Sequence, residues 1–466
     1  MDQKTQYFQL FPDFLLRGWE DVKYALIDSR SGRQIPLTGP AADALELAWN
    51  GIPQDFPIML PTYRRVFETL IRDHCGTLTE EFVEPRPEQR MKSASCNCTA
   101  SLCWSITGRC NMKCRHCYVE APDALYGELP LPECVGIMDQ MVDANIYSVM
   151  LTGGEPLVRA DWQDFYAALK ERRIAVQAIY TNGLLVTNRW LDEFEKLEGR
   201  KITFSLSFDG VGHHDWLRGR EGVERPVIDA IRRLVERGYP VEIESVVYRD
   251  NLDSLPATCE LLMELGIRKW KVAEVSDSKA WRKYAAAHNI VSREALNRGY
   301  LNLLERFQSL GRPFQLQIDH RYLYDPQSGK AFALALLGGR SETLLKQPVC
   351  GCMRHHPYLL PDGTLMPCMP LANCGLDKEM PNLREIPLVE VLSSKSRFFD
   401  FISITPEEMF RREGSECAAC EFRFQCCGGC RARAYAGGNL YGPDPALCDY
   451  FRNGTGKLFE PFYDPF

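Results

Sequence analysis

The sequence predicts an α/β fold built on a parallel sheet. Between residues 100 and 289, short apolar runs alternate with segments of helical pattern such as Asp161–Arg173 and Arg225–Arg237. Strands that alternate with helices of this length are typical of parallel βαβ units. The strand-like runs are Leu102–Thr107, Ile146–Thr152, Ala175–Tyr180, Thr203–Phe208, Val241–Val247 and Trp270–Val275. A glycine-rich, polar or cysteine-rich motif stands at the end of each of the first four runs, where parallel sheets bind ligands.

Composition and charge narrow the classes of function. The chain has 466 residues, a net charge of −7 and 19 cysteines. An acidic chain is not expected to bind nucleic acid as its main purpose. We expect no membrane span, because no apolar run approaches the roughly 18 residues needed. The first residues lack the pattern of a secretory signal, so we expect a cytoplasmic protein whose cysteines bind metal or clusters and do not form disulfides.

Five segments are expected along the chain. They are a small module (1–82), a polar linker (83–99), the α/β domain (100–289), a helix-rich bridge (290–349) and a cysteine-rich domain (350–466). In the first module, strands are expected at Tyr7–Leu16, Tyr24–Asp28 and Gln34–Leu37, with helices ending near Trp49 and spanning Thr62–Cys75. No further strand is expected before the linker, so Gln34–Leu37 should lie at the edge of its sheet.

Three cysteines follow the first strand of the α/β domain. Cys110, Cys114 and Cys117 can converge on one cluster from a single loop. Four thiolates saturate a 4Fe–4S cluster, whereas three leave one iron free to bind a ligand. Two alternatives are a zinc site completed by His116 and simple buried thiols. Cys96, Cys98 and Cys103, just upstream, are interpreted as buried thiols.

The CxxxCxxC loop, together with Gly153-Gly154-Glu155-Pro156 after the second strand, resembles the radical S-adenosylmethionine (radical SAM) enzymes. The resemblance implies a partial (β/α)6 TIM-like barrel and a 4Fe–4S cluster whose open iron binds S-adenosylmethionine. In that family, an electron from the cluster cleaves S-adenosylmethionine, and the resulting radical abstracts a hydrogen atom. The resemblance also implies a set of cofactor-binding residues: Gly153, Gly154, Glu155, Pro156, Ser207, Asp209 and Arg218. Arg218 is expected to pair with the methionyl carboxylate.

A second group of cysteines begins at Cys350 and matches the SPASM extension of radical SAM enzymes, including its x2-x5-x3 core spacing. A zinc ribbon explains the CxxC pair but not the remaining spacing. The resemblance implies two auxiliary 4Fe–4S clusters. The outer one would be held by Cys417, Cys420, Cys426 and Cys448, and the inner one by Cys350, Cys368 and Cys430. Either Cys352 or Cys374 could complete the inner site, or substrate could bind there.

The first module resembles the PqqD-like winged-helix module known as the RiPP recognition element, which binds leader peptides. This resemblance rests on element order and on residues 32–51. With the barrel and the SPASM extension, it implies a maturase that abstracts hydrogen from a ribosomally made precursor peptide and installs a thioether or carbon–carbon crosslink. Its expected partners are the precursor, with its leader on residues 1–82, and an electron donor such as flavodoxin or ferredoxin.

Two other functions stay open from the sequence. One is a cofactor maturase acting on a tetrapyrrole or quinone precursor, because the tail from Cys430 to Cys448 resembles the haem-modifying SPASM branch. The other is a non-enzymatic zinc scaffold that binds a peptide.

Overall fold

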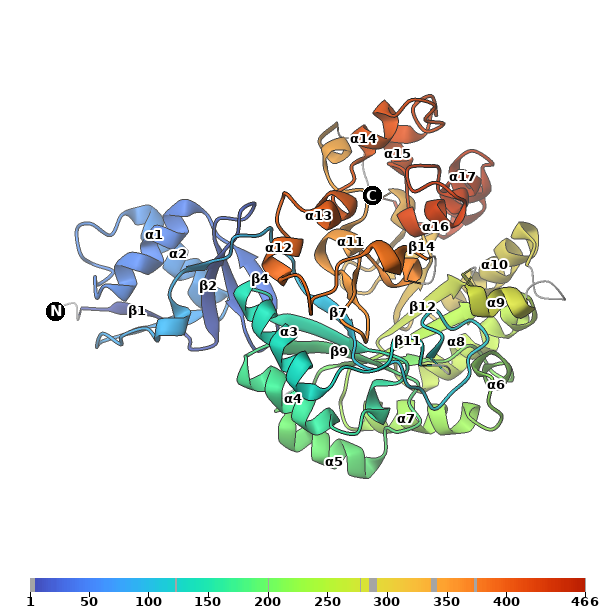
Figure 1. Ribbon diagram of the computed structural model, residues 1–466, viewed down its shortest axis with the longest axis horizontal. Helices are drawn as coiled ribbons and strands as arrows, with labels where there is room; N and C mark the ends of the chain where they lie inside the picture. The colour runs from blue at the N-terminus through green and yellow to red at the C-terminus, as the bar shows by residue number, and fades with distance from the viewer. Residues whose placement is uncertain are drawn as a thin grey trace.

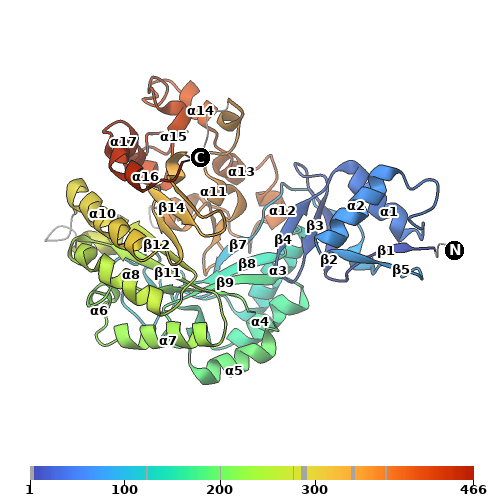
Figure 2. The ribbon, with the colours of Figure 1, turned by 180° about the vertical axis from the view of Figure 1, so that it is seen from behind.

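A computed structural model describes residues 5–121, 124–199, 201–276, 278–284, 291–336, 342–372 and 375–465. The expected segment boundary at 289 and the candidate ligand Cys374 lie outside these residues. The N-terminal module projects to one side, and the C-terminal segment covers the central sheet on the side away from helices α4, α5 and α7 (Figure 1). The view from behind shows the same three-part arrangement (Figure 2).

The N-terminal module contains two small sheets and two helices. Its elements are β1 (Tyr7–Leu10), β2 (Phe14–Gly18), β3 (Ala25–Asp28), β4 (Arg33–Pro36), α1 (Gly39–Trp49), α2 (Pro61–Arg72), β5 (Gly76–Thr79) and β6 (Lys92–Ser93). One sheet has the order β4-β3-β2-β6, and β1 pairs with β5. The expectation that no strand follows Gln34–Leu37 was wrong, because β5 does. That strand nevertheless lies at a sheet edge as predicted, because β5 pairs elsewhere.

The expected linker packs against its neighbours. Arg17 donates to the backbone carbonyl of Glu88, and Gln89 is buried and donates to the carbonyl of Phe11. The module itself is anchored to the central domain, since Trp19 Nε1 donates to the carbonyl of Ala144 at 2.9 Å. These contacts indicate a fixed position for the module relative to the barrel.

All six strands expected in the central domain are present. They are β7 (Leu102–Ser105), β8 (Ser148–Thr152), β9 (Ala175–Thr181), β10 (Thr203–Ser207), β11 (Val241–Val247) and β12 (Lys269–Glu274). The helices between and after them are α3 (Leu131–Asp143), α4 (Trp162–Glu171), α5 (Asn188–Leu197), α6 (His214–Arg218), α7 (Glu224–Glu236), α8 (Leu255–Glu264), α9 (Lys279–Tyr284) and α10 (Arg293–Ser309). On α7, buried residues recur at i, i+3, i+4 and i+7 from Val227, which turns one face of the helix to the core.

The central sheet is larger than the sequence predicted. Its order is β15-β14-β13-β12-β11-β10-β9-β8-β7-β16-β17. The expectation of a mainly helical bridge after residue 290 was incomplete, because β13 (Gln315–Ile318) pairs parallel with β12, and β14 (Tyr322–Asp325) and β15 (Lys330–Phe332) follow antiparallel. The pairs from β7 to β13 are all parallel, so the fold is α/β, as predicted.

The C-terminal segment contributes β16 (Tyr358–Leu359) and β17 (Leu365–Met366) to the other edge of this sheet, and β16 runs parallel to β7. Its helices are α11 (Gly351–His355), α12 (Leu388–Val391), α13 (Arg397–Ile402), α14 (Pro406–Arg411), α15 (Arg423–Cys426), α16 (Arg431–Ala436) and α17 (Pro445–Phe451). None of the helices within the described ranges is long and apolar enough to cross a membrane.

Candidate active site

The cysteine loop begins directly after β7 and presents its sulfurs as hydrogen-bond acceptors. The backbone amides of Met112 and Ala121 donate to the sulfurs of Cys110 and Cys117, each at 3.4 Å. The third sulfur, of Cys114, lies 3.9 Å from Arg218 Nη1. Donors directed at sulfur favour the thiolate form, which is the form that binds iron.

The three loop cysteines can all be ionised together only if a cation is bound between them. Burial, with a smaller contribution from the neighbouring thiols, raises the pKa of Cys110 to about 12 and that of Cys117 to about 11. Because three adjacent thiolates repel one another, they can coexist only around positive charge such as iron. The residues present therefore fit an iron–sulfur cluster held by Cys110, Cys114 and Cys117. The alternative ligand His116 is buried, and burial lowers its pKa to about 3.

The Gly-Gly-Glu-Pro segment after β8 packs directly on the cysteine loop. Gly154 N donates to Thr107 O at 2.8 Å, and Glu155 N donates to Arg109 O at 2.9 Å. A β-carbon at Gly154 would lie 2.2 Å from Arg109 O, and one at Gly153 would lie 2.7 Å from Thr107 O. Glycine is therefore required here by the backbone of the cysteine loop itself. The expected contact of this segment with the cofactor's ammonium stays a prediction, as does the part of Pro156, which begins a short 3₁₀ turn.

Glu155 is fully buried and joins the ends of two strands. One carboxylate oxygen accepts hydrogen bonds from Thr181 Oγ1 (2.7 Å) and Leu157 N (3.2 Å), and the other accepts from Asn182 N (2.7 Å). Burial raises the pKa of Glu155 to about 7, although these three donors oppose the rise. The amide of Asn182 in turn donates to Asn111 Oδ1 at 2.6 Å, which connects the end of β9 to the cysteine loop.

Asp209 and Arg218 form a buried ion pair beside the cluster cysteines. Arg218 Nε and Nη2 donate to the two carboxylate oxygens at 2.6 and 2.9 Å, and Val246 N donates to Asp209 as well. Burial would raise the pKa of Asp209, but the Arg218 guanidinium and His214 outweigh it and hold that pKa well below its usual range. Two of the three guanidinium nitrogens thus donate hydrogen bonds to Asp209, and the third points to the sulfur of Cys114. The expected pairing of Arg218 with a ligand carboxylate stays a prediction.

The four motifs expected at one rim do meet there. The cysteine loop contacts three segments that follow strands of the sheet. The contacts are with Gly154 after β8, with Asn182 after β9 and with Gly219 after β10. Gly219 has φ +65°, and a β-carbon on it would lie 2.1 Å from Lys113 O. Ser207, the last residue of β10, is half-buried at this rim.

Several residues of the site were not foreseen from the sequence. The guanidinium of Arg115 lies 4.7 Å from the ring centroids of both Trp216 and Tyr284. Tyr118, next to Cys117, hydrogen-bonds Ser276 Oγ at 2.5 Å. Each of these pairs joins residues more than 100 positions apart in the chain. No local sequence pattern predicts such contacts, which arise because the ends of parallel strands lie at one edge of the sheet.

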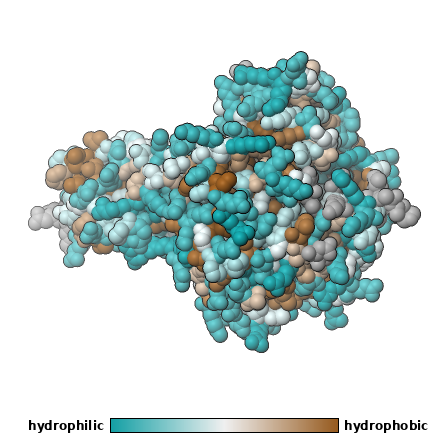
Figure 3. Space-filling view, viewed as in Figure 1, coloured by the Kyte–Doolittle hydropathy of each residue, from teal (hydrophilic) through white to brown (hydrophobic). Residues whose placement is uncertain are grey.

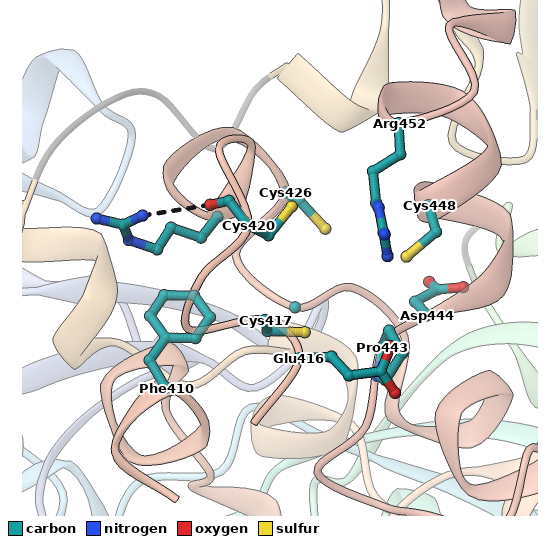
Figure 4. A pocket seen from close by; sticks show the side chains of 11 residues that line it. Phe410, Glu416, Cys417, Cys420, Cys426, Pro443, Asp444, Cys448 and Arg452 are labelled. Atoms are coloured by element: carbon teal, nitrogen blue, oxygen red, sulfur yellow. Dashed lines mark hydrogen bonds between the residues drawn. The ribbon is translucent and has the colours of Figure 1, made fainter. Parts of the chain in front are cut away.

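The outer group of SPASM-like cysteines lines one cavity. Cys417, Cys420, Cys426 and Cys448 surround about 350 Å³ free of protein atoms, open solvent at its mouth included. The sulfurs of Cys417, Cys426 and Cys448 point toward its middle (Figure 4). Arg452 lies beside Cys448 and lowers its pKa, although burial raises it more. In the described part of the chain, no three or more His, Cys, Asp or Glu side chains are arranged around a single-ion site.

The inner cysteines lie between the outer cavity and the barrel. The thiols of Cys350, Cys368 and Cys430 are all close enough to Cys352 to act on its pKa. Cys368 and Cys430 also belong to the same packed apolar cluster as Cys110 and Cys117. The structure thus brings every predicted cysteine ligand into one of three groups, with the inner group next to the cysteine loop.

Comparison with known proteins identifies the central domain. Residues 104–262 match the family model described as the radical SAM superfamily. An AdoMet-dependent heme synthase of Nitratidesulfovibrio vulgaris is 24% identical over 358 residues, which is 75% of this chain and 92% of that protein. A PqqA peptide cyclase of Granulibacter bethesdensis is 25% identical over 348 residues, covering 73% and 85%.

Two solved structures share the fold. Streptococcus suis SuiB bound to S-adenosylmethionine aligns with a TM-score of 0.61 at 18% identity, covering 94% of this chain and 99% of SuiB. The enzyme anSMEcpe with bound AdoMet aligns with a TM-score of 0.58 at 17% identity, covering 78% and 97%. The expected cofactors S-adenosylmethionine and one 4Fe–4S cluster follow from the domain match, and a non-enzymatic scaffold is excluded. The protein is therefore an enzyme that carries a radical SAM domain within residues 104–262.

Proposed function

We propose that this enzyme is a maturase of a ribosomally made precursor peptide. It would abstract hydrogen from a residue of the core peptide and install a thioether or carbon–carbon crosslink, while the leader peptide is held by residues 1–82. The likeness of fold to SuiB over 94% of the chain carries this proposal, because it extends beyond the radical SAM domain. SuiB has also been solved with its precursor peptide SuiA, and that structure aligns with a TM-score of 0.63 over 95% of this chain.

Curated relatives support a peptide substrate. Besides the PqqA peptide cyclase, the subtilosin biosynthesis protein AlbA of Bacillus subtilis is 28% identical over 178 residues, which is 37% of this chain. Both names describe proteins that act in peptide maturation or bacteriocin synthesis, and we extend that role to this chain.

The edge strand β4 is the proposed leader site. Leu37 N donates to the carbonyl oxygen of Tyr24, the residue before β3, and Ile35 is paired with Leu26 on β3. Bonded and non-bonded pairs alternate in antiparallel sheets, so Ile35 bonds to β3 while Gln34 and Pro36 face the open edge. An extended peptide could add a strand there by bonding to Gln34 N–H and to the carbonyls of both residues. Partly buried apolar side chains on β4 and α2 would receive its side chains.

An ion pair on β11 and β12 is the proposed contact for the core peptide. Glu244 on β11 and Lys271 on β12 form an ion pair at 3.2 Å, and their side chains are 39% and 40% exposed. Lys271 also lies near Tyr118 of the cysteine loop and acts on the pKa of Cys352 in the inner group. A peptide between the cysteine loop and the inner thiols would therefore lie against this pair.

Two auxiliary 4Fe–4S clusters are proposed at the SPASM-like cysteines. Cys417, Cys420, Cys426 and Cys448 would hold the outer one, and the four thiols of Cys350, Cys368, Cys430 and Cys352 would hold the inner one. The closeness of Cys352 to Cys350 favours Cys352 as the fourth inner ligand. When bound, these clusters supply a place for the electron that crosslinking releases. With four thiolates each, neither would offer substrate an open iron.

The second candidate is a tetrapyrrole-modifying enzyme. The heme synthases among the relatives are 24% identical over three quarters of this chain, including that of Methanosarcina barkeri over 77%. Those alignments leave about a quarter of this chain without a counterpart, whereas the SuiB alignment covers the N-terminal module as well. The peptide proposal therefore accounts for more of the chain.

A protein electron donor, such as flavodoxin or ferredoxin, and a cytoplasmic location are also part of the proposal. Cysteines stay reduced in the cytoplasm, as cluster ligands require.

Incubation with candidate substrates tests the proposal. The enzyme is purified and loaded with clusters without oxygen, then given S-adenosylmethionine, a reductant and the peptide encoded by a short reading frame beside its gene. We expect a product that has lost two hydrogens, and removal of residues 1–82 should abolish it while 5′-deoxyadenosine still forms. A porphyrin product from an added iron coproporphyrin, with no change in the peptide, would favour the second candidate.

A further inference from the structure

The cysteine loop is surrounded by cations, and only some of them are neutralised. Arg218 is paired with Asp209 inside the site, and Arg109, whose side chain is 60% exposed, is paired with Glu128 at 2.8 Å. Lys113 lies between two cluster cysteines in the sequence and is exposed. No ion pair joins Lys113 to a carboxylate within the described ranges.

Arg220, close to Lys113, is also exposed, and within the described ranges no ion pair joins it to a carboxylate. Its Nη1 donates to Asn111 O at 3.0 Å, so the guanidinium is held against the outside of the loop. The left-handed Gly219, which packs on Lys113 O, separates Arg218 from Arg220. One cation is thereby placed inside the site, and the other lies beside Lys113 on the surface.

This local positive charge contrasts with the whole chain, whose net charge is −7. An acidic protein is repelled by most of this molecule, and complementary charge at one place both steers and orients it. The place in question lies within one or two residues of Cys110 and Cys114, where the path from the surface to the cluster is short.

We propose that Lys113 and Arg220 form the docking surface for a small acidic protein that donates single electrons. The inference rests on the proposed need for a protein electron donor and names the surface that receives it. Reductive cleavage of S-adenosylmethionine consumes one electron, by which the partner is oxidised. The carbon–sulfur bond would break to give methionine and a 5′-deoxyadenosyl radical. That radical becomes 5′-deoxyadenosine by taking a hydrogen atom from the peptide or, without peptide, a second electron from the reductant and a proton from water. A small, charged contact of this kind suits the transient complexes of electron-transfer proteins.

The test compares two reductants and needs no peptide substrate. Reduced acidic flavodoxin and dithionite each drive formation of 5′-deoxyadenosine by the cluster-loaded enzyme, at about 20 mM and about 300 mM salt. In a Lys113→Glu/Arg220→Glu variant, we expect the flavodoxin-driven rate at low salt to fall at least about fivefold. The dithionite-driven rate should stay within about twofold of wild type, and the salt dependence of the flavodoxin reaction should be lost.

Two controls make the outcome unambiguous. Lys457→Glu reverses an exposed cation in the C-terminal segment and should leave both rates unchanged. Lys113→Gln, which alters no hydrogen bond of the loop seen in the structure, should give a smaller loss in the same direction. Iron and sulfide content confirm that each variant is loaded.

Two results would overturn the proposal. An unchanged flavodoxin-driven rate would show that the donor docks elsewhere. Equal losses with both reductants, accompanied by a shifted midpoint potential of the cluster, would show that the cations tune the cluster and do not dock a protein. Failure of the peptide proposal would leave this test intact, because it measures only the cleavage of S-adenosylmethionine.

Discussion

At the residue scale, the site is held together by buried polar groups whose partners come from different strands. Glu155 joins β8 to β9, and Asp209 joins β10 to β11 through Val246 N and to the cysteine loop through Arg218. Removing one member of such a buried set leaves the others desolvated and unsatisfied. The individual residues therefore affect both stability and the geometry of the cluster loop.

Replacing Asp209 with Ala should destabilise the protein by about 3–5 kcal/mol, because it leaves the buried Arg218 without a counter-charge. The matched control is Asp229→Ala, which breaks a half-exposed pair with Arg232 and should cost about 0–1 kcal/mol. Urea unfolding monitored by circular dichroism measures both. Equal stability of the two variants would contradict the importance assigned to the buried pair.

Gly154→Ala should displace the cysteine loop, since its new methyl would lie 2.2 Å from Arg109 O. Overpacking against backbone costs about 1–3 kcal/mol, and the loop is the part that can move. We expect the variant to lose the first cluster while keeping the iron of the C-terminal segment, as measured by iron content and electron paramagnetic resonance. Gly136→Ala, in α3 with open space around it, should lose no iron.

Glu155 should make stability depend on pH. Its folded-state pKa of about 7 lies above the usual 4.5, so the unfolded chain ionises first as pH rises. The associated stability is fully present below about pH 4.5 and is lost as pH rises through 7. The loss amounts to about 3 kcal/mol by the linkage relation. Wild type should lose more stability between pH 5 and 7.5 than Glu155→Gln, and equal slopes in urea unfolding would refute this assignment.

At the element scale, the strands of the βαβ units were predictable, and the strands added at the two edges of the central sheet were not. The runs that became β7 to β12 are apolar, bounded by turns and separated by amphipathic helices, so local pattern was sufficient. Strands such as β13 and β16 have only four and two residues, and they owe their existence to pairing with β12 and β7. Pairing over such distances leaves no periodic signal.

The edge strand β4 allows a direct test of the leader site. Gln34→Pro removes an N–H that faces the open edge, so the module should fold while its affinity for the leader falls about tenfold, the effect of one lost hydrogen bond of about 1.4 kcal/mol. Ile35→Pro instead removes a bond to β3 and should unfold the sheet. Fluorescence anisotropy of a labelled leader measures binding. Unchanged affinity in folded Gln34→Pro protein would exclude strand addition at β4.

The space-filling view shows apolar side chains gathered on the N-terminal module as well as near the centre of the molecule (Figure 3). Phe56, Ile58 and Leu60, in the loop between α1 and α2, are each about half exposed. These residues lie apart from the barrel, so they are compatible with a module that receives a flexible peptide. Their exposure could not be predicted from the sequence, because it depends on how the chain packs.

At the scale of the whole molecule, the sequence predicted which residues belong to each site better than it predicted the contacts between them. The cysteine spacings predicted three groups of ligands; the structure brings the members of each group together, and their part as ligands stays a prediction. Spacing alone did not show that Arg218 is held by Asp209, or that the glycines of residues 153 and 154 serve the cysteine loop. These contacts depend on where neighbouring strands end relative to one another, and that is set only by the pairing of strands in the folded sheet.

The central claim is that the cysteine loop holds a cluster that cleaves S-adenosylmethionine. The most direct measurement is formation of 5′-deoxyadenosine by protein reconstituted without oxygen, alongside its iron, sulfide and zinc content. Wild type should form 5′-deoxyadenosine and hold about 12 irons if all three sites carry 4Fe–4S clusters. A variant with Cys110, Cys114 and Cys117 replaced by Ala should form none and keep about eight irons. Wild-type protein that binds zinc without iron and forms no 5′-deoxyadenosine would contradict the account.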